Sequence, residues 1–402
     1  MHFFVKIITK EGKTGYTLVA SPDFASLDRK LKADGVVPLN ITPLPAFISK
    51  ILPDFRKKVK PDEVVEILES LHLIIKSGIP LYDGLKDFAK ESDNKSTRAM
   101  LYDIADSINR GNSLSHAFEP YKKIVGPVIL NLIKIGEDTG QLETTLKRAA
   151  EFTSRVIALK KKAKGALIYP AFSFVAVFGA MLVWMIYVLP QLLGLFKSMG
   201  VKLPPLTKAI IAVSDFLSAY ILYIIAAIII FIIIFRIAHK RYKKVRLFTD
   251  KVVLKIPIIK EIVKGFNIAF ITQYLRLALV SGVPIFNALK SLTTNLTNEV
   301  FKDALESSTK LVSQGHQIST SFAKTGVFSP FTTRMINVGE SAGSLDAQLN
   351  IISDHYYERV NYFAENISKV IEPVVMIMVG GFMAIVVAGL MGPLYDLISH
   401  VQ

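Results

Sequence analysis

Three long stretches of this chain are apolar and contain no charged residue. They cover residues 171–193, 216–235 and 374–394, and each is long enough for a helix to cross the hydrocarbon core of a bilayer. The second consists largely of bulky aliphatic residues, which is typical of a helix that faces lipid. The pattern therefore predicts three transmembrane helices, with a loop over 194–215 between the first two.

Lysine and arginine gather on one side of these spans. Basic runs at 160–162 and 240–244 precede the first span and follow the second, whereas the 194–215 loop has only three lysines and 395–402 has neither residue. Because cytoplasmic flanks are enriched in Lys and Arg, the spans are predicted to run outward, inward and outward again. The opening residues lack the apolar core of a cleavable signal peptide. We therefore expect a cytoplasmic N-terminus and a periplasmic C-terminus.

Before the first span, apolar residues recur at the spacing of one helical face. Pro61 suits the first turn of this helix, Gly78 its C-terminal cap, and Pro80 the first turn of the next helix. Gly111 breaks a later helical segment. These signals predict an all-α bundle of about six short helices over 61–165. The apolar face of its first helix comprises Val64, Ile67, Leu68, Leu71, Ile74 and Ile75.

The chain also repeats itself. Residues 71–86 align with 275–290 at an offset of 204, and seven of these 16 positions are identical. The collinear blocks predict two copies of one unit, each ending in a membrane helix, with the second bundle over 265–370. The further aligned blocks are 111–118 with 315–322, 135–142 with 338–345, and Tyr169-Pro170 with Glu372-Pro373.

The first residues follow a different pattern. Segments 3–9 and 14–20, separated by Glu11-Gly12, are predicted to form a hairpin, and 36–41 a further strand. Ser21-Pro22 suits the start of a helix that ends at Gly35. We therefore expect a small α+β module over 1–42. Residues 43–60 contain three prolines and a basic run, and are predicted to form a linker.

Two glycine motifs recur in both repeats. In Gly-Glu-x-x-Gly-x-Leu the glycines permit a tight corner between helices, and the carboxylate can cap backbone N–H groups or bond a neighbouring helix. The alternative for Glu137 and Glu340 is a polar contact with a partner or a cation. In Ser-Gly-x-Pro the glycine ends one helix and the proline starts the next. The motif residues are Gly78, Pro80, Gly282 and Pro284, and Gly136, Glu137, Gly140, Leu142, Gly339, Glu340, Gly343 and Leu345.

The third span carries a stripe of small residues at four-residue spacing: Gly380, Ala384, Ala388 and Gly392. Small residues at this spacing allow two helix backbones to approach closely. The stripe therefore indicates either packing within one subunit or contact with another membrane helix in an oligomer. Contact with another membrane helix is our hypothesis, because spacing alone does not identify the neighbour.

Several kinds of chemistry are excluded or unsupported by composition. The absence of cysteine excludes disulfides, zinc–thiolate sites and iron–sulfur clusters. The seven histidines show no metal-ligand spacing, and Gly12-Lys13-Thr14 lacks the earlier glycine of a phosphate-binding loop. We expect no catalytic site, cofactor or metal, so this chain is not predicted to be an enzyme. Any nucleotide-driven work would fall to a partner.

The paired motifs, three spans and two repeats resemble the type II secretion F family, the inner-membrane platform proteins of type II secretion and type IV pilus machines. The resemblance covers nearly the whole chain, and Tyr169, Pro170 and Pro190 look like the family's membrane signature. It implies a multi-pass, oligomeric protein of the bacterial inner membrane. The implied partners are a hexameric cytoplasmic assembly ATPase, pilin or pseudopilin subunits, and other inner-membrane components of the machine.

Two other classes of protein remain as alternatives. A transporter built from parallel repeats would need ionisable groups deep in its spans, and the three spans have no charged residue in their middle. A membrane-anchored nucleic-acid-binding protein is suggested by the formal net charge of +15. Its cations, however, lie beside the spans, where they set orientation, so nucleic acid is not an expected partner.

Overall fold

In the computed structural model, the structure describes residues 2–8, 14–20, 37–43, 59–198 and 204–401. Contacts divide the chain into two compact units, 1–150 and 151–402. The predicted all-α architecture with a small strand module is confirmed. The helix expected over 21–35 lies outside the described residues, as does most of the linker over 43–60.

The N-terminal strands form a three-stranded antiparallel sheet. Strands β1 (His2–Ile8), β2 (Thr14–Ala20) and β3 (Val37–Pro43) lie in the order β2-β1-β3. The first two form the predicted hairpin, with His2 opposite Ala20. β3 pairs with the other edge of β1, and the register shifts between Lys6 and Ile7.

The first repeat is a bundle of short helices ending in one long helix. Its core consists of the apolar stripe predicted for the first helix, including Ile67, Leu68 and Leu71, packed with later side chains such as Leu101 and Phe118. The elements are α3 (Pro61–Lys76), α4 (Leu81–Glu91), α5 (Lys95–Asn109), α6 (Leu114–Phe118), η1 (Glu119–Tyr121), α7 (Lys122–Val125), α8 (Pro127–Asp138) and α9 (Leu142–Gly165).

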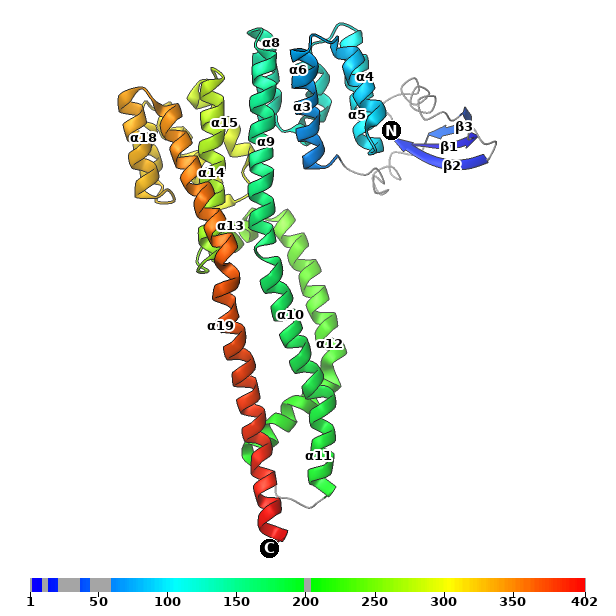
Figure 1. Ribbon diagram of the computed structural model, residues 1–402, viewed down its shortest axis with the longest axis vertical. Helices are drawn as coiled ribbons and strands as arrows, with labels where there is room; N and C mark the ends of the chain where they lie inside the picture. Colours follow the sequence, from blue (N-terminus) through cyan, green and yellow to red (C-terminus); the bar gives the residue numbers. More distant parts are fainter. Residues whose placement is uncertain (1, 9–13, 21–36, 44–58, 199–203, 402) are drawn as a thin grey trace. The chain divides into compact units, whose positions relative to one another are not determined.

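The second unit contains the membrane helices and the second repeat. After α9 come α10 (Ile168–Val183), the π-helical turn η2 (Trp184–Val188), α11 (Leu189–Ser198), α12 (Pro205–Arg241) and α13 (Lys243–Val253). The second bundle comprises α14 (Ile259–Val280), α15 (Ile285–Asn295), α16 (Glu299–Ser313), α17 (Ile318–Lys324), α18 (Pro330–Ala342) and α19 (Leu345–Val401). Figure 1 shows that α19 runs without a break from the second bundle to the C-terminal end of the chain.

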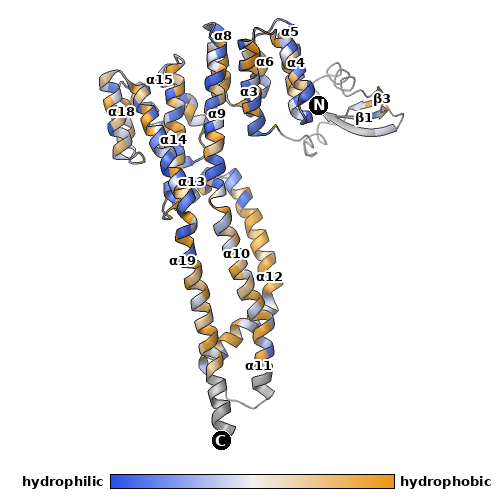
Figure 2. Ribbon diagram, in the orientation of Figure 1, coloured by the Kyte–Doolittle hydropathy of each residue, from blue (hydrophilic) through white to orange (hydrophobic). Residues whose placement is uncertain are grey.

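Among the described residues, three helical segments are long and apolar enough to cross a membrane: 142–192, 205–241 and 345–391. Their apolar parts stand out in Figure 2 from the mixed surfaces of the bundle helices. Each helix extends beyond the apolar stretch that predicted it. Within the segment predicted as the 194–215 loop, α11 continues to Ser198 and α12 begins at Pro205.

The described contacts between the three membrane helices lie close to the α11–α12 connection. Thr207 Oγ1 donates a hydrogen bond to the carbonyl of Gly389 (2.6 Å), and Ser214 Oγ donates to the carbonyl of Met185 (2.6 Å). Met185 lies in the π turn, where the N–H of Leu189 donates to the carbonyl of Trp184 five residues earlier. Pro190, five residues after Met185, has no N–H to donate to the Met185 carbonyl. These hydrogen bonds satisfy two buried hydroxyl groups, and they join α12 to α19 and to the π turn η2.

At the opposite ends of the spans, α9 and α19 pair within the second unit. Arg155 lies 3.4 Å from Asp354, and Lys162 lies 3.3 Å from Glu365. All four side chains are about half exposed, so each pair contributes roughly 0–1 kcal/mol. Lys162 and Glu365 occupy the same position of the two aligned repeats.

Candidate functional site

The glutamate of each Gly-Glu-x-x-Gly-x-Leu motif caps a short helix. Glu137, at the end of α8, accepts hydrogen bonds from the N–H groups of Leu114 and Ser115, the first residues of α6. Such N–H groups have no partner within their own helix, and a carboxylate also interacts favourably with the positive end of the helix dipole. Both oxygens of Glu137 are therefore used within the first bundle.

The second repeat reproduces this arrangement. Glu340 of α18 accepts from the N–H groups of Ile318 (2.5 Å) and Ser319 (2.9 Å) at the start of α17. The geometry favours the capping role over the alternative of a partner or cation contact. Among the described residues, no group of three or more His, Asp or Glu side chains is arranged to hold a metal ion.

The glycines of this motif serve two different purposes. A Cβ at Gly339 would lie 2.8 Å from the Cα of Leu345, and one at Gly136 would lie 2.9 Å from the Cα of Leu142. These leucines begin the long helices α19 and α9, so the first glycine allows close contact between consecutive helices. The second glycine, at 140 or 343, has a positive φ of 67° or 66° and ends the preceding helix.

The Ser-Gly-x-Pro motif forms a matched pair of helix ends. Gly78 has a φ of 69°, and the N–H of Ile79 donates to the carbonyl of Ile74 (3.1 Å). In the second repeat, Gly282 has a φ of 77°, and Val283 donates to Ala278 (2.9 Å). This six-residue hydrogen-bonded ring satisfies a terminal carbonyl of the helix. Pro80 and Pro284 then occupy the N-cap positions of α4 and α15.

Sequence reasoning did not identify a further repeated cap. Asn94 Oδ1 accepts from the N–H of Ser96 (3.0 Å), and Asn298 Oδ1, at the same offset of 204, accepts from the N–H groups of Val300 (3.0 Å) and Phe301 (3.2 Å). Asparagine is among the favoured N-cap residues, so the conserved offset of the two asparagines was the signal that could have revealed the pair.

The two caps have different surroundings. In the first repeat, Glu63 accepts hydrogen bonds from Thr97 Oγ1 (2.6 Å), Asn94 Nδ2 (2.8 Å) and the backbone N–H of Lys60 (3.0 Å). Burial raises the pKa of Glu63, but these hydrogen bonds outweigh it and leave the pKa below its ordinary value. The corresponding position in the second repeat is Asn267, which donates to its own helix.

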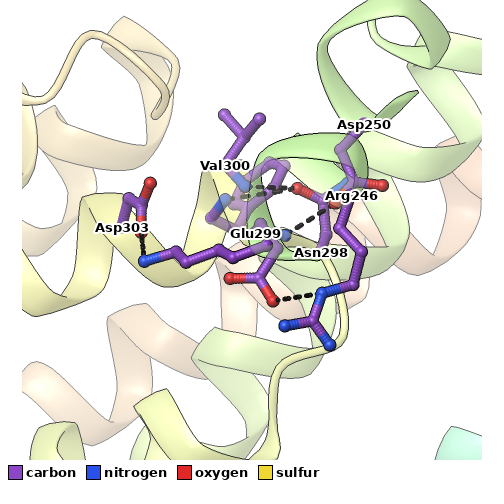
Figure 3. Close-up of polar contacts among 8 residues, drawn as sticks. Arg246, Asp250, Asn298, Glu299, Val300 and Asp303 are labelled. Carbon is purple, nitrogen blue, oxygen red and sulfur yellow. Dashed lines mark hydrogen bonds and ion pairs between the residues drawn. The ribbon is translucent and has the colours of Figure 1, made fainter. Parts of the chain in front are cut away.

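In the second repeat, α13 supplies the polar partners of α16 (Figure 3). Arg246 Nε lies 3.1 Å from Glu299 Oε1, Asp250 Oδ2 accepts from the N–H of Glu299 (2.7 Å), and Lys243 Nζ lies 2.8 Å from Asp303 Oδ1. Glu299 is only 3% exposed. Burial raises the pKa of Asp250 above its ordinary value. This cluster holds the connector that follows α12 against the second bundle.

The predicted membrane signature lies at the beginnings of helices. Tyr169 and Pro170 are in the first turn of α10, where Tyr169 is exposed and Pro170 is buried, and Pro190 is in the first turn of α11. Proline is tolerated at 170 because the N–H groups of the first turn of α10 have no partner within that helix. Pro190 comes just after the π turn, and its missing N–H leaves the Met185 carbonyl free to accept from Ser214.

The small-residue stripe lies on the exposed side of α19. Gly380, Ala384 and Ala388 are exposed, and no described residue would lie within 4 Å of a Cβ at Gly380. Gly392 also belongs to α19. A different face makes the described contacts: Phe382 packs edge-on against Trp184 at 5.7 Å between ring centroids, and Gly389 contacts Ile210. In the described part of the chain, Gly380, Ala384 and Ala388 are thus available to another helix.

Comparison with known proteins identifies the family. The family model described as "Type II secretion system (T2SS), protein F" matches residues 67–190 and 271–393, one match in each repeat. A type IV pilus assembly protein PilC of Pseudomonas aeruginosa is 29% identical over 341 residues, covering 85% of this chain and 91% of the relative.

Two further relatives match almost the full length of the chain. A type IV pilus assembly protein PilC of Myxococcus xanthus is 27% identical over 395 residues, covering 98% of this chain and 94% of the relative. A type II secretion system protein F of Vibrio cholerae is 22% identical over 398 residues, covering 98% of each. Because the matched segments of the family model together span more than half of the chain, this protein belongs to the type II secretion system protein F family.

Proposed function

We propose that this membrane protein is the inner-membrane platform of a type II secretion or type IV pilus machine. In this role it couples a cytoplasmic assembly ATPase to the extraction and polymerisation of pilin-like subunits, and it is not itself an enzyme. The relatives named above are type IV pilus assembly and type II secretion proteins, which supports a role within such a machine.

The observation that carries the coupling proposal is the continuity of α19. This helix of 57 residues begins at the glycine corner of the second bundle and includes the third predicted span. At about 1.5 Å per residue, it is roughly 85 Å long. A displacement of the second bundle would therefore be transmitted into the membrane without passing through a flexible joint.

The proposed orientation follows from the flanking charges. The bundles would lie in the cytoplasm, where an assembly ATPase is accessible, and the α11–α12 connection would lie in the periplasm. Other inner-membrane components and a second copy of this chain are the proposed lateral partners. The exposed stripe Gly380, Ala384 and Ala388 is the proposed contact for another membrane helix.

Because the chain has no cysteine, any introduced cysteine would be its sole thiol and a single attachment point for a crosslinker. We would place one at Ala384 in one strain and at exposed Lys123 of the first bundle in another, and identify the captured proteins in cells. Capture of pilin-like subunits or a second copy from Ala384, and of an assembly ATPase from either bundle, would support the proposal. Position Lys310 would probe the second bundle in the same way.

Recovery of neither class of partner from an intact, inserted protein would favour the transporter alternative. The stripe is tested separately by Gly380→Leu with Ala384→Leu, which should impair assembly while leaving insertion unchanged. Val387→Leu, at an exposed position that already has a large side chain, is the matched control. Normal assembly by the double variant would contradict the proposed contact between the stripe and another membrane helix.

A further inference from the structure

Helix α13 lies at the end of the second membrane span. It begins at Lys243, and α12 ends at Arg241 after a long apolar run. The single residue between them, Tyr242, is extended, with φ −113° and ψ 117°, so the two helices do not form one continuous rod. The apolar run of α12 ends at Phe235, and α13 starts just after the basic last turns of α12, in contact with α16 of the second bundle (Figure 1).

One face of α13 is held against the bundle by charged groups. Lys243, Arg246 and Asp250 recur at three- and four-residue spacing, and all three make the polar contacts with α16 shown in Figure 3. Leu247 lies beside this face and lines a groove between α13 and α16. The inner surface of the helix is thus largely polar.

The opposite face of α13 is apolar and points away from the bundle. Phe248 is 69% exposed and Val252 is 42% exposed, and these residues lie one helical turn apart. Lys244 and Lys251 are exposed on the flank of this face, where Lys251 also lines the rim of the groove that Leu247 lines. Just beyond the helix, Ile256 is 40% exposed.

This distribution is the reverse of what a helix on the surface of a soluble domain shows. Such a helix turns its apolar stripe toward the core and its charges toward water. An aromatic and aliphatic face with flanking lysines is instead characteristic of helices that lie in the membrane interface. A helix that follows a membrane span after one basic turn lies within reach of the lipid headgroups.

We propose that α13 lies in the plane of the leaflet at the basic end of α12 and binds anionic phospholipids. Phe248 and Val252 insert among the upper acyl chains, and Lys244 and Lys251 contact the headgroup phosphates. Because the other face of α13 is paired with Glu299 and Asp303, bound lipid fixes α16, and with it the second bundle, against the membrane surface. This inference does not depend on the identity of the machine or its ATPase.

The test uses the full chain, whose lack of cysteine allows a single spin label at Phe248→Cys. Lys310→Cys, at an exposed position farther along α16, provides the control. Each protein is reconstituted in nanodiscs of phosphatidylcholine alone or mixed with phosphatidylglycerol. Accessibility of the label to oxygen, which concentrates in lipid, is compared with accessibility to a water-soluble nickel chelate.

We expect the label at position 248 to favour oxygen, most strongly with phosphatidylglycerol, and the label at 310 to favour nickel in both bilayers. Each lysine near an anionic surface is worth about a fivefold change in the docked-to-undocked ratio. Lys244→Gln with Lys251→Gln should lower this ratio by about thirtyfold, in the anionic bilayer only. Lys290→Gln with Arg334→Gln removes the same charge from exposed positions elsewhere and should have no effect.

Three results would overturn the proposal. Equal nickel accessibility at 248 and 310 would place α13 in water. Protection from both reagents would mean that protein, such as a second copy or a partner, covers the apolar face. Oxygen accessibility that is the same with and without phosphatidylglycerol, and unchanged by the lysine substitutions, would remove the anionic-lipid site. Circular dichroism of each variant checks that the fold is retained.

Discussion

The capping carboxylates of the repeated corners allow a quantitative prediction. Glu340→Ala would remove the only described acceptor for the N–H groups of Ile318 and Ser319, while the rest of α18 stays intact. Neither N–H has an intrahelical partner, since both residues are in the first turn of α17. The substitution should therefore loosen the start of α17 before it affects the remaining bundle.

The expected magnitude follows from the two hydrogen bonds. Hydrogen bonds to a charged acceptor contribute about 1.5–3 kcal/mol each when buried, and loss of a helix cap costs about 0.5–2 kcal/mol. Because the Glu340 side chain is half-buried, water replaces part of the lost interaction. We estimate a loss of about 2 kcal/mol for alanine. Glutamine keeps one acceptor oxygen but no charge, so its loss should be about 1 kcal/mol.

Amide hydrogen exchange measures this opening at the residues concerned. The exchange rates of the Ile318 and Ser319 amides should rise about thirtyfold in Glu340→Ala and about fivefold in Glu340→Gln. Glu306→Ala, at an exposed position of α16, is the matched control and should leave both rates unchanged. Because the first repeat has the same geometry, Glu137→Ala should act equally on the amides of Leu114 and Ser115.

The reasoning is refuted if Glu340→Ala leaves exchange at Ile318 and Ser319 unchanged. A uniform increase across the whole second bundle would also contradict it, because the cap would then be a determinant of global rather than local stability. A nickel- or calcium-dependent change in exchange that disappears in Glu340→Gln would instead revive the cation alternative for this residue.

Three further substitutions test the close contacts and the acidic cap. Gly339→Ala would place a Cβ 2.8 Å from the Cα of Leu345, and should destabilise the protein by about 1–3 kcal/mol in thermal unfolding, whereas the uncrowded Gly381→Ala should not. Glu63→Gln should destabilise the first bundle at neutral pH, because the folded pKa of Glu63 is lowered. The stabilising effect of the Glu63 carboxylate is present above the unfolded pKa of about 4.3 and disappears as the pH falls through the folded pKa. The urea midpoints of variant and wild type should therefore converge in acid. Gly389→Leu would overlap Ile210 and should lower the thermal midpoint in detergent by separating α12 from α19, and an unchanged midpoint would show that this contact is dispensable.

Local sequence patterns predicted most of the elements. The uncharged stretches identified the three spans, and the positive-φ glycines at 78 and 282 ended the first helix of each repeat as expected. The hairpin of the N-terminal module was predicted from two strand-like segments on either side of Glu11-Gly12. These signals are reliable because each depends on the conformation or burial of residues that are neighbours in the chain.

The roles of individual side chains were predicted less completely. The spacing of Glu137 and Glu340 allowed either a cap or an external contact, because the capped amides are more than 20 residues earlier in the chain. The small-residue stripe that begins at Gly380 likewise allowed two kinds of neighbour, a helix of the same subunit or a helix of another protein chain. A helical pattern identifies a face of a helix but not the neighbour that packs against it. The glycine of α19 that lies close to another helix is Gly389, which contacts Ile210 of α12 and is outside the stripe.

The chain's own pattern of residues was sufficient for its helices, its repeats and its membrane character, since hydrophobic spacing and turn residues act locally. Packing decided which face of α19 meets its neighbours and which amides Glu340 caps. Packing also decided which face of α13 is exposed. The basic run was evident in the sequence, but only the contacts of Arg246 and Asp250 with Glu299 show that the polar face meets the bundle and the apolar face does not. Contacts between residues distant in sequence depend on how whole helices are arranged, and that arrangement is not encoded in any single segment.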